Sequence, residues 1–400
     1  MKAYPDYKSS GIDWLGDIPE HWKIAKIGWL FDAKAGGDAK PELYSDIKDD
    51  SHPYPVYTNT LIEHQVYAYS CEALFKAGSI TVTGRGDIGH AFVREEDFDA
   101  IIRLVVLTPR NNQECMYFKY FIDVVIPFFT DSAAVGQLSA SQIIKYHIAV
   151  PPISEQKAIA AYLDDMTGKV DALITEKQKQ VEDLRSYRTS LITETVTRGL
   201  NPSTPLRPSD IDWLGDIPGH WISTKAKYYI EIKSGDPISK DDINSQGSVP
   251  IFGGGEIIGY TTESNVPAQT IIIGRVGARC GCVRLSDIEA WATDNALVVF
   301  TSQNPRFLTR IFEAANLNRL NESNAQPLIT ATKIKDLGIP LPPLAEQQAI
   351  AEFLDEKTEK IDALISELEK QLEELAEYKK AVISEAVTGK VDVRDWKPQN

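Results

Sequence analysis

Two loops in this chain combine glycine and arginine in an arrangement that suits contact with a nucleic acid. The sequence TGRGDIG occupies residues 83–89 and IGRVGAR occupies residues 273–279, and each follows a run of β-branched residues. Glycine allows a backbone to approach a ligand closely, and an arginine side chain can bind a phosphate or form two hydrogen bonds with guanine. A tight hairpin with an exposed arginine is the alternative interpretation. The candidate contact residues in these loops are Gly84, Arg85, Gly86, Gly274, Arg275 and Arg279.

Further candidates lie at matching places in the two halves of the chain. The tripeptides KAG at residues 34–36 and KSG at residues 233–235 match, and a lysine follows each of them. Ser139 and Thr330 are predicted N-caps of short helices, whose N-termini can bind phosphate, although plain capping is the favoured interpretation. Isolated arginines, including Arg103, fit a contact or a solvated surface equally well. The remaining candidates for DNA contact are Lys34, Gly36, Lys40, Arg94, Gln137, Ser139, Lys233, Gly235, Lys240, Arg284 and Thr330.

No catalytic motif accompanies these candidates. The sequence contains no phosphate loop of the GxxxxGKS or GxxxxGKT type, no HExxH zinc helix and no GxSxG elbow. Cys71 and Cys115 are isolated, and the neighbouring Cys280 and Cys282 lack the second pair that a zinc site needs. We interpret the thiols as structural. The sequence therefore predicts a binding protein with no metal site, no cofactor of its own and no catalytic residues.

Composition limits the kinds of partner. The net charge of −15 argues against nucleic acid, because phosphate contacts need lysine and arginine. However, the excess of acid is concentrated in residues 1–150 and 342–400, so a local basic face elsewhere is compatible with it. No apolar stretch approaches the roughly 20 residues that span a bilayer, and the first residues show no signal-peptide pattern. We expect a cytoplasmic protein with no membrane partner.

The chain is an internal duplication, a tandem repeat of one unit of roughly two hundred residues. The sequence IDWLGDIP occurs at residues 12–19 and again at residues 211–218, and a second shared segment begins PPISEQKAIAAYLD at Pro151 and PPLAEQQAIAEFLD at Pro342. The interiors of the two copies have diverged. We interpret Trp22 and Trp221, which follow the first motif, as packing anchors more readily than as a base-stacking platform.

Each second shared segment predicts a long helix made to pair with another. Apolar residues recur at alternating steps of three and four, which gives a seam of about four heptads. Pro-Pro blocks extension of each helix backward, and Gly199 or Gly389 closes it. The seam is supplemented on one flank by Ile174 and Val181 and, in the second copy, by Ile365 and Leu372. The predicted pairing residues are Leu163, Val170, Leu173, Leu184, Tyr187, Leu354, Ile361, Leu364, Leu375 and Tyr378.

The predicted fold class is α+β. Short β-like runs and glycine-rich turns fill residues 1–150 and 201–341, which we expect to form two tandem globules of mixed α/β structure. The long helices are expected at residues 151–200 and 342–390, followed by a tail at residues 391–400. Two such helices in one chain can bury their seams against each other, so we expect an antiparallel coiled coil between the globules.

In these features the chain resembles the specificity subunit of type I restriction-modification enzymes. The resemblance is carried by IDWLGDIP with His-Trp downstream, by the Gly-Arg loops, and by Pro-Pro-x-x-Glu-Gln opening a helix that contains DALI at residues 171–174 and 362–365. It implies two target-recognition domains, each reading half of a bipartite double-stranded DNA sequence. The paired helices would set the spacing and dock two methyltransferase subunits.

The same resemblance places all catalysis on partner subunits. The methyltransferase subunits would bring S-adenosylmethionine, and restriction and translocation subunits would use ATP and Mg²⁺. Two alternatives remain, a non-catalytic coiled-coil scaffold and an acidic DNA-mimic inhibitor. A mimic needs rows of carboxylates, but basic residues are interleaved with acids in both globules. A scaffold would leave two diverged globules without a purpose.

Overall fold

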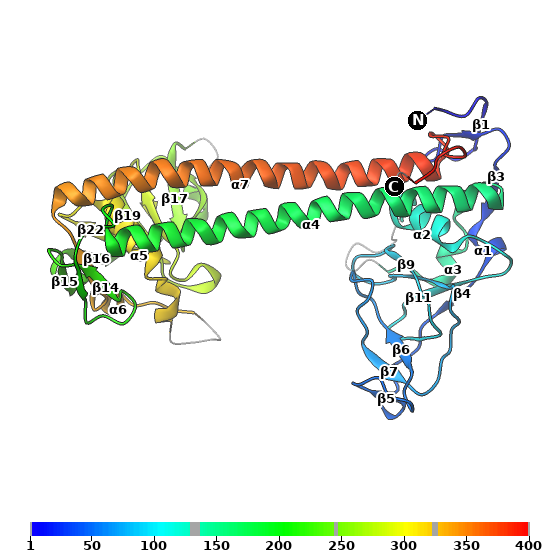
Figure 1. The fold of residues 1–400 in the computed structure, drawn as a ribbon, viewed down its shortest axis with the longest axis horizontal. Coiled ribbons are helices and arrows are strands. Elements are labelled where there is room, and N and C mark those ends of the chain that lie inside the picture. Colours follow the sequence, from blue (N-terminus) through cyan, green and yellow to red (C-terminus); the bar gives the residue numbers. More distant parts are fainter. Residues whose placement is uncertain (1, 129–136, 244–246, 322–326, 399–400) are drawn as a thin grey trace. The chain divides into compact units, whose positions relative to one another are not determined.

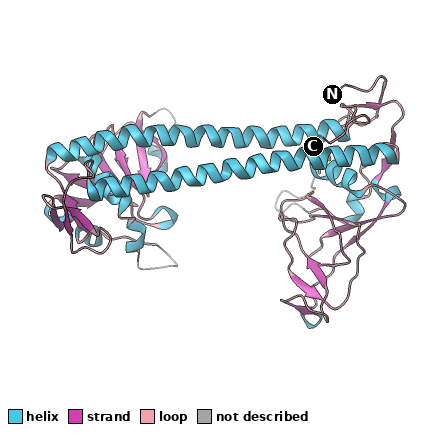
Figure 2. Ribbon diagram, in the orientation of Figure 1, coloured by secondary structure: helices cyan, strands magenta, loops and turns pink. Residues whose placement is uncertain are grey.

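The computed structural model describes residues 2–128, 137–243, 247–321 and 327–398. The chain forms two compact units: unit 1 runs to Lys177 and resumes at Lys370, and unit 2 comprises Gln178–Glu369. Each unit contains one globule and parts of both long helices, α4 (Ile153–Arg198) and α7 (Leu344–Val387), as Figures 1 and 2 show. The compact units therefore cut across the consecutive segments expected from the sequence, whose boundaries stay predictions.

The globule of unit 1 is built on two four-stranded β-sheets. Its elements are β1 (Tyr7–Ser9), β2 (Asp17–Pro19), β3 (Lys23–Lys26), α1 (Ile27–Leu30), β4 (Phe31–Ala35), η1 (Pro41–Leu43), β5 (Tyr44–Ser45), β6 (Tyr54–Tyr57), β7 (Ala68–Ser70), β8 (Ile80–Val82), β9 (Ala91–Val93), β10 (Asp99–Ala100), β11 (Val105–Pro109), α2 (Cys115–Val124), α3 (Ala140–Ile143) and β12 (His147–Val150). The main sheet has the strand order β4-β11-β8-β9, and its neighbouring strands are antiparallel. The smaller sheet, β10-β6-β7-β5, lies at the end of this unit farthest from α4 (Figure 1). Beside these two sheets, β1 pairs with β2 and β3 pairs with β12.

Unit 2 repeats this architecture. Its elements are β13 (Leu206–Pro208), β14 (Asp216–Pro218), β15 (Ile222–Lys225), η2 (Ala226–Tyr228), β16 (Ile230–Ser234), η3 (Lys240–Asp242), β17 (Val249–Gly253), β18 (Glu256–Thr261), β19 (Thr270–Gly274), η4 (Gly277–Arg279), β20 (Val283–Ser286), β21 (Trp291–Ala292), β22 (Ala296–Thr301), α5 (Pro305–Ala314), η5 (Leu317–Leu320), α6 (Ala331–Lys335) and β23 (Gly338–Leu341). The main sheet is β16-β22-β19-β20, and the smaller sheet is β18-β17-β21. The strand β21 is parallel to β17, as β10 is parallel to β6. The α+β class with two tandem globules is confirmed.

Hydrogen bonds between the two shared motifs attach each globule to the start of its long helix, α4 in unit 1 and α7 in unit 2. In unit 1 the carboxylate of Glu155 accepts hydrogen bonds from the Tyr4 hydroxyl (3.1 Å) and from Nε1 of Trp22 (3.0 Å), and it lies 2.7 Å from Nε2 of His21. In unit 2 the carboxylate of Glu346 lies 2.9 Å from Nε2 of the matching histidine. Both tryptophans that follow the motif are buried, so their prediction as packing anchors is confirmed.

The glutamine of the Pro-Pro-x-x-Glu-Gln motif completes the attachment. Gln156 donates to the carbonyl of Pro151 (3.0 Å) and accepts from the backbone N–H of Glu114, the residue before α2 (3.0 Å). In unit 2, Gln347 makes the matching pair of hydrogen bonds with Pro342 and with Asn304, before α5. The motif thus joins the start of each long helix to a helix of its globule.

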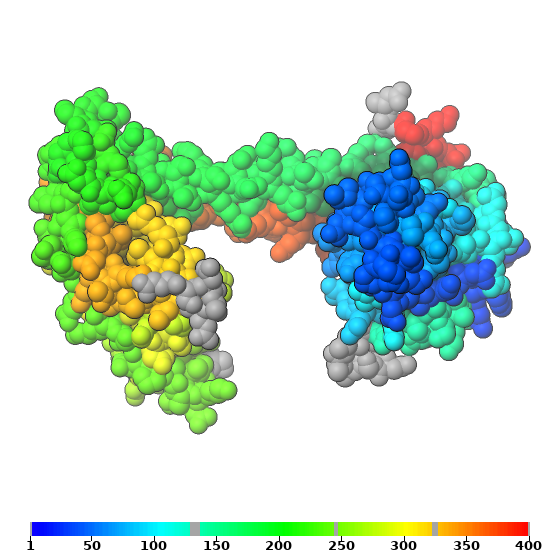
Figure 3. All heavy atoms as spheres, turned by 90° about the horizontal axis from the view of Figure 1, so that it is seen from below, coloured from blue at the N-terminus to red at the C-terminus, as the bar shows by residue number. Residues whose placement is uncertain are grey.

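The carboxyl-terminal tail packs in unit 1. The ring of Trp396 meets the ring of Tyr162 on α4 edge to face, with centroids 5.5 Å apart. Figure 3 shows the tail, in red, lying against α4. Val393 is buried in the core of the same unit. The tail therefore belongs to the folded part of unit 1 as far as the structure describes it.

The antiparallel pairing of α4 with α7 is confirmed in both units. In unit 1, Nζ of Lys379 lies 2.6 Å from a carboxylate oxygen of Asp171; in unit 2, Nε of Arg188 lies 2.8 Å from the carboxylate of Asp362. Residue numbers thus fall along α7 as they rise along α4. Exposed ion pairs contribute ~0.2–1 kcal/mol each, so they set register more than stability. No described helix, including these two, is both long and apolar enough to cross a membrane.

The seam between the helices has a different phase from the predicted one. Four predicted pairing residues are exposed, whereas the flanking Val181 and Ile365 are buried. Leu173 and Leu364 each stand directly before an isoleucine, so the spacing permits two phases there, and only the partner helix selects one. Leu163, Val170, Leu354 and Ile361 are buried as predicted, and Leu184 and Leu375 are half-buried. The exposed residues are Leu173 (51%), Tyr187 (57%), Leu364 (56%) and Tyr378 (49%).

Adjacent residues of α7 test this phase. We expect Ile365→Ala to lower the free energy of unfolding by about 2–3 kcal/mol, because it removes a buried seam side chain. Leu364→Ala, the matched control, should change it by less than about 0.5 kcal/mol, because that side chain is mostly exposed. Denaturant unfolding followed by helical circular dichroism measures both. Equal losses in the two variants would contradict the observed phase.

Candidate nucleic-acid interface

The Gly-Arg loops lie at the same edge of the main sheet in both units. In unit 1 the end of β4 at Ala35 and the end of β8 at Val82 both pair with Val105, the start of β11. The segments that continue from these strand ends therefore meet. We use the name sheet edge for this border, at which the ends of neighbouring strands meet. In unit 1 it comprises residues 34–37, 84–86, 101–104 and 137–138.

Close backbone packing explains the glycines of the sheet edge in unit 1. A Cβ atom on Gly36 would lie 2.5 Å from the carbonyl oxygen of Ala100, and one on Gly84 would lie 2.7 Å from that of Leu138. The next residue, Arg85, forms an isolated β-bridge with Gln137. These contacts leave the Arg85 side chain exposed. The structure therefore brings together four of the predicted groups, at residues 36, 84, 85 and 137.

The sheet edge of unit 2 repeats the backbone arrangement with other side chains. A Cβ atom on Gly235 would lie 2.2 Å from the carbonyl oxygen of Ala292, and one on Gly274 would lie 2.2 Å from that of Gly254. The backbone N–H of Arg275 donates to the carbonyl of Asn295 (3.0 Å). Its Nη1 donates to the hydroxyl of Ser234 (3.4 Å), between the predicted residues Lys233 and Gly235. Val276 bridges to Leu328, as Arg85 does to Gln137.

Exposed cations gather at the sheet edge of unit 1. Lys34, Arg85 and Arg103 are exposed, and within the described part of the chain none of the three forms an ion pair. Nζ of Lys34 lies 5.7 Å from the centre of the Phe75 ring. In unit 2, by contrast, Lys233 pairs with Glu231 (3.1 Å). An acidic globule thus presents a local positive surface, which suits the phosphates of DNA.

The prediction that Arg94 contacts DNA is wrong. Its side chain is 3% exposed, and Nε donates to the hydroxyl of Thr81 (2.9 Å). The guanidinium lies 3.7 Å from the centre of the Tyr57 ring, and burial lowers the pKa of Arg94. The sequence could not show this, because the residues that cover Arg94 come from other strands.

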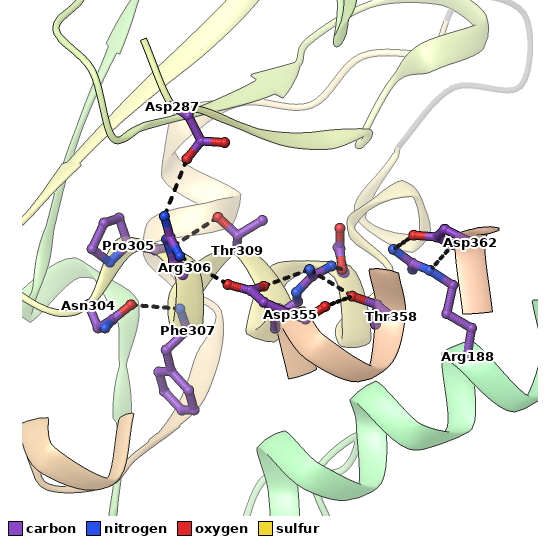
Figure 4. A network of polar contacts seen from close by, with 12 residues as sticks. Arg188, Asp287, Asn304, Pro305, Arg306, Phe307, Thr309, Asp355, Thr358 and Asp362 are labelled. Atoms are coloured by element: carbon purple, nitrogen blue, oxygen red, sulfur yellow. Dashed lines mark hydrogen bonds and ion pairs between the residues drawn. The ribbon is translucent and has the colours of Figure 1, made fainter. Parts of the chain in front are cut away.

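Arg284 does not join the sheet edge either. It lies on β20 and lines a cavity of about 340 Å³ together with Arg188, Arg306 and Arg310. Figure 4 shows the polar network there, with Arg306, Asp355 and Arg188 labelled. Arg310 contacts Asp355 (3.0 Å) and so holds α5 to α7. Arg188, Arg306 and Arg310 pair with carboxylates and connect elements of the fold. Arg284 itself is exposed and forms no ion pair with another described residue, so its contact with DNA stays a prediction.

Several other candidates have structural partners or lie elsewhere. Arg279 forms an ion pair with Glu256. Lys40 precedes η1 and Lys240 begins η3, and no described hydrogen bond or ion pair joins either lysine to the sheet edge. Gly86 adopts a φ of 76°, which turns the Gly-Arg loop of unit 1.

The two predicted N-caps differ. The Ser139 hydroxyl accepts the backbone N–H of Gln142 (3.3 Å), and the Gln142 side chain accepts that of Ser139 (2.8 Å), so this N-cap is confirmed as a capping box. Thr330 occupies the N-cap position of α6 but makes no side-chain capping bond. Plain capping therefore accounts for Ser139.

No sequence pattern pointed to Asn59 or Asn295. The Asn59 side chain accepts the backbone N–H of Gly84 (2.7 Å) and donates to the carbonyl of Ile102. The backbone carbonyl of Asn295 accepts a hydrogen bond from the backbone N–H of Arg275. Single asparagines in loops are common, and the partners of these two are distant in the chain, so no spacing could have identified them.

Two neighbouring glycines test the close packing at the sheet edge. We expect Gly36→Ala to destabilise the protein by about 1–3 kcal/mol, because the new methyl group would overlap the Ala100 carbonyl. Gly37→Ala should change stability by less than about 0.5 kcal/mol, because no atom lies within 4 Å of its Cβ position. Thermal unfolding measures both. A well-tolerated Gly36→Ala would show that the edge can open.

The two globules correspond to a known protein family. The family model described as "Type I restriction modification DNA specificity domain" matches residues 19–183 and 221–374. The chain belongs to this family and carries its domain twice. It functions as a DNA specificity subunit with two target-recognition domains, and the scaffold and mimic alternatives are not favoured. Membership of this family implies DNA and restriction-modification subunits as partners.

Individual relatives agree with this assignment. The chain is 23% identical over 417 residues to the "Type I restriction enzyme MjaVIII specificity subunit" of Methanocaldococcus jannaschii, covering 94% of this chain and 95% of the relative. It is 28% identical over 191 residues to the "Putative type I specificity subunit S.MpnORF89P" of Mycoplasma pneumoniae, covering 46% of this chain and 56% of that one. A chain in a solved structure of a type I restriction-modification system has the same fold, with a TM-score of 0.68, 13% identity, and coverage of 94% and 99%.

Proposed function

We propose that each globule reads one half of a bipartite double-stranded DNA target through its sheet edge. The observation that carries the proposal is the repetition of one backbone arrangement with two sets of side chains. The bridge of Arg85 with Gln137 in unit 1 corresponds to the bridge of Val276 with Leu328 in unit 2, where Arg275 is the residue before it. Phosphate contacts position a protein on DNA, whereas base contacts specify sequence. One arrangement with different side chains therefore supports two different half-sites.

We further propose that the helix pair docks two methyltransferase subunits and sets the spacing of the half-sites. Each unit exposes a leucine on one helix and a tyrosine on the other: Leu173 and Tyr378 in unit 1, and Leu364 and Tyr187 in unit 2. The ion pair between Asp171 and Lys379 puts the residues of unit 1 at the same level of the helix pair. Exposed apolar positions that recur once in each unit support two equivalent docking sites.

Catalysis in the proposed complex belongs to the partners. We propose that S-adenosylmethionine binds the methyltransferase subunits, that restriction and translocation subunits use ATP and Mg²⁺, and that the complex works in the cytoplasm. Among the described residues no group of three or more His, Cys, Asp or Glu side chains is arranged to hold a metal ion. The role assigned to this chain is sequence recognition.

Methylome sequencing tests the proposed function. A host would express a cognate methyltransferase subunit, with and without this chain. We expect adenine methylation in a bipartite motif only when the chain is present. If the two proteins form a folded complex but no motif is methylated, the proposal is overturned and a scaffold role is favoured.

A further inference from the structure

Three large apolar side chains are exposed on unit 1 close to the cations of the sheet edge. Leu61 (53% exposed) and Ile62 (63%) lie in the loop between β6 and β7, and Ile102 (44%) lies in the turn between β10 and β11. We call these three residues the apolar rim. Large apolar side chains gathered on the surface of a soluble protein generally mark a contact site.

Asn59 ties the apolar rim to the Gly-Arg loop. Its side-chain oxygen accepts the backbone N–H of Gly84 (2.7 Å), and its side-chain nitrogen donates to the carbonyl of Ile102. One side chain therefore joins the loop that carries Leu61 and Ile62, the turn that carries Ile102, and the loop that carries Arg85. The apolar rim and the exposed cations belong to one surface.

A buried arginine holds the loop of the apolar rim in place. Nη1 of Arg94 donates to the carbonyl of Glu63, immediately after Ile62, while Nε of Arg94 is bound to Thr81. The guanidinium is stacked on Tyr57, and its Nη2 has no hydrogen-bond partner among the described residues. Burying an arginine that is not fully satisfied is costly, so the contacts of Arg94 with Tyr57, Thr81 and Glu63 must offset that cost while they hold the loop.

The turn of the apolar rim is strained. Ile102 has a φ of 54° and Arg103 a φ of 57°, a region that β-branched and long side chains rarely adopt. Such strain persists where the surrounding structure imposes it, and it concentrates at ligand-contacting sites. Here it presents an apolar and a cationic side chain, both exposed, from consecutive residues.

Unit 2 exposes a comparable pair. Ile257 and Ile258 are 51% and 52% exposed on β18, which forms a hairpin with β17 as β7 does with β6. The turn of that hairpin is packed against the Gly-Arg loop of its own unit, because a Cβ atom on Gly274 would lie 2.2 Å from the Gly254 carbonyl oxygen. Apolar residues beside a Gly-Arg loop are therefore a feature of both copies.

We propose that the apolar rim packs against the C5-methyl groups of thymine in the first DNA half-site, while Lys34, Arg85 and Arg103 hold the flanking phosphates. This inference rests on the proposed reading of DNA by the globule and names the bases that it reads. The thymine methyl is the apolar group that base pairs present in the major groove, and apolar side chains recognise it by contact. Cations around the apolar rim favour DNA over a protein partner, because the centres of protein interfaces are poor in charge.

The test uses the complex of the full chain with its methyltransferase subunits and duplexes carrying its methylated motif. Each thymine of the first half-site is replaced in turn by deoxyuridine, which lacks only the methyl group. We expect about a fourfold loss of affinity for each methyl that the apolar rim covers, since burial of one such group contributes about 0.8 kcal/mol. The double variant Leu61→Ala/Ile62→Ala should lose affinity for thymine DNA but show little further loss with deoxyuridine.

Ile47→Ala is the matched control, because Ile47 is 73% exposed in the same globule and lies outside the apolar rim. It should retain the full response to deoxyuridine. Equal responses to deoxyuridine in the double variant and in the unmodified chain would overturn the inference, as would a double variant that binds DNA normally but no longer binds the methyltransferase. If the unmodified complex shows no sequence preference at all, the proposed function itself has failed; if it prefers its motif but ignores deoxyuridine, only this inference has failed.

Discussion

Charge reversal at the Gly-Arg loops is expected to remove specific DNA binding. Arg85→Glu or Arg275→Glu should each lower the affinity of the complex for its bipartite site by at least about 100-fold. Each change removes a cation worth about 1–3 kcal/mol if it contacts guanine or a phosphate, and it adds repulsion from the DNA backbone. Both side chains lie at a sheet edge of their unit, and neither forms an ion pair with another described residue.

Fluorescence anisotropy with labelled duplexes at several salt concentrations measures this effect. A phosphate contact should weaken binding to all sequences and reduce the salt slope by about 1, whereas a base contact should relax the preference at one position. The control is Arg110→Glu. Arg110 directly follows β11 and therefore lies at the opposite edge of the main sheet, where it pairs with Asp32 (2.7 Å). Unchanged specific binding by both loop variants would favour the scaffold interpretation.

A negative charge at the exposed tyrosines of the helix pair is expected to release the methyltransferase subunits. Tyr187→Asp should remove one subunit, Tyr378→Asp should remove the other, and the double variant should remove both. Tyrosine is enriched among the residues that dominate interfaces, and loss of such a residue costs at least about 2 kcal/mol, or roughly 30-fold in affinity. A buried unpaired carboxylate costs more.

Native mass spectrometry of the assembled complex counts the subunits directly. Because both tyrosines are about half exposed, the variants should keep the helicity and the unfolding midpoint of the unmodified chain. Tyr228→Asp is the control, since Tyr228 is 70% exposed on the globule of unit 2. Two methyltransferase subunits retained by the double variant would place the docking surface elsewhere.

Local signals made the long helices predictable. Proline at Pro152 and Pro343 ends the preceding strand and starts each helix, and the helices end just before Gly199 and Gly389, whose φ angles are 74° and 75°. The phase of the seam was not predictable in the same way. Ile365 and Leu364 are adjacent and both apolar, so a helix can bury either, and the choice depends on its partner.

In the candidate site, too, some features were predictable from local sequence and others depended on tertiary packing. Glycine beside arginine in both copies was enough to predict that Arg85 and Arg275 lie in matching loops, although Arg85 is exposed and Arg275 is half-buried. Arg94 carries an equally suitable side chain for DNA contact, but a ring from β6 and a hydroxyl from β8 cover it. Asn59 carries no distinguishing signal, although it joins two segments of the sheet edge to the loop between β6 and β7.

The sequence by itself determined the duplication, the two long helices and the Gly-Arg loops, because repeats, helix stops and glycine-dependent turns are encoded by residues close together in the chain. The tertiary structure alone decided which face of each helix is buried, which arginines remain exposed, and which distant segments meet at the sheet edge. These outcomes depend on the burial of side chains against elements far away in sequence, and burial is a property of the folded chain.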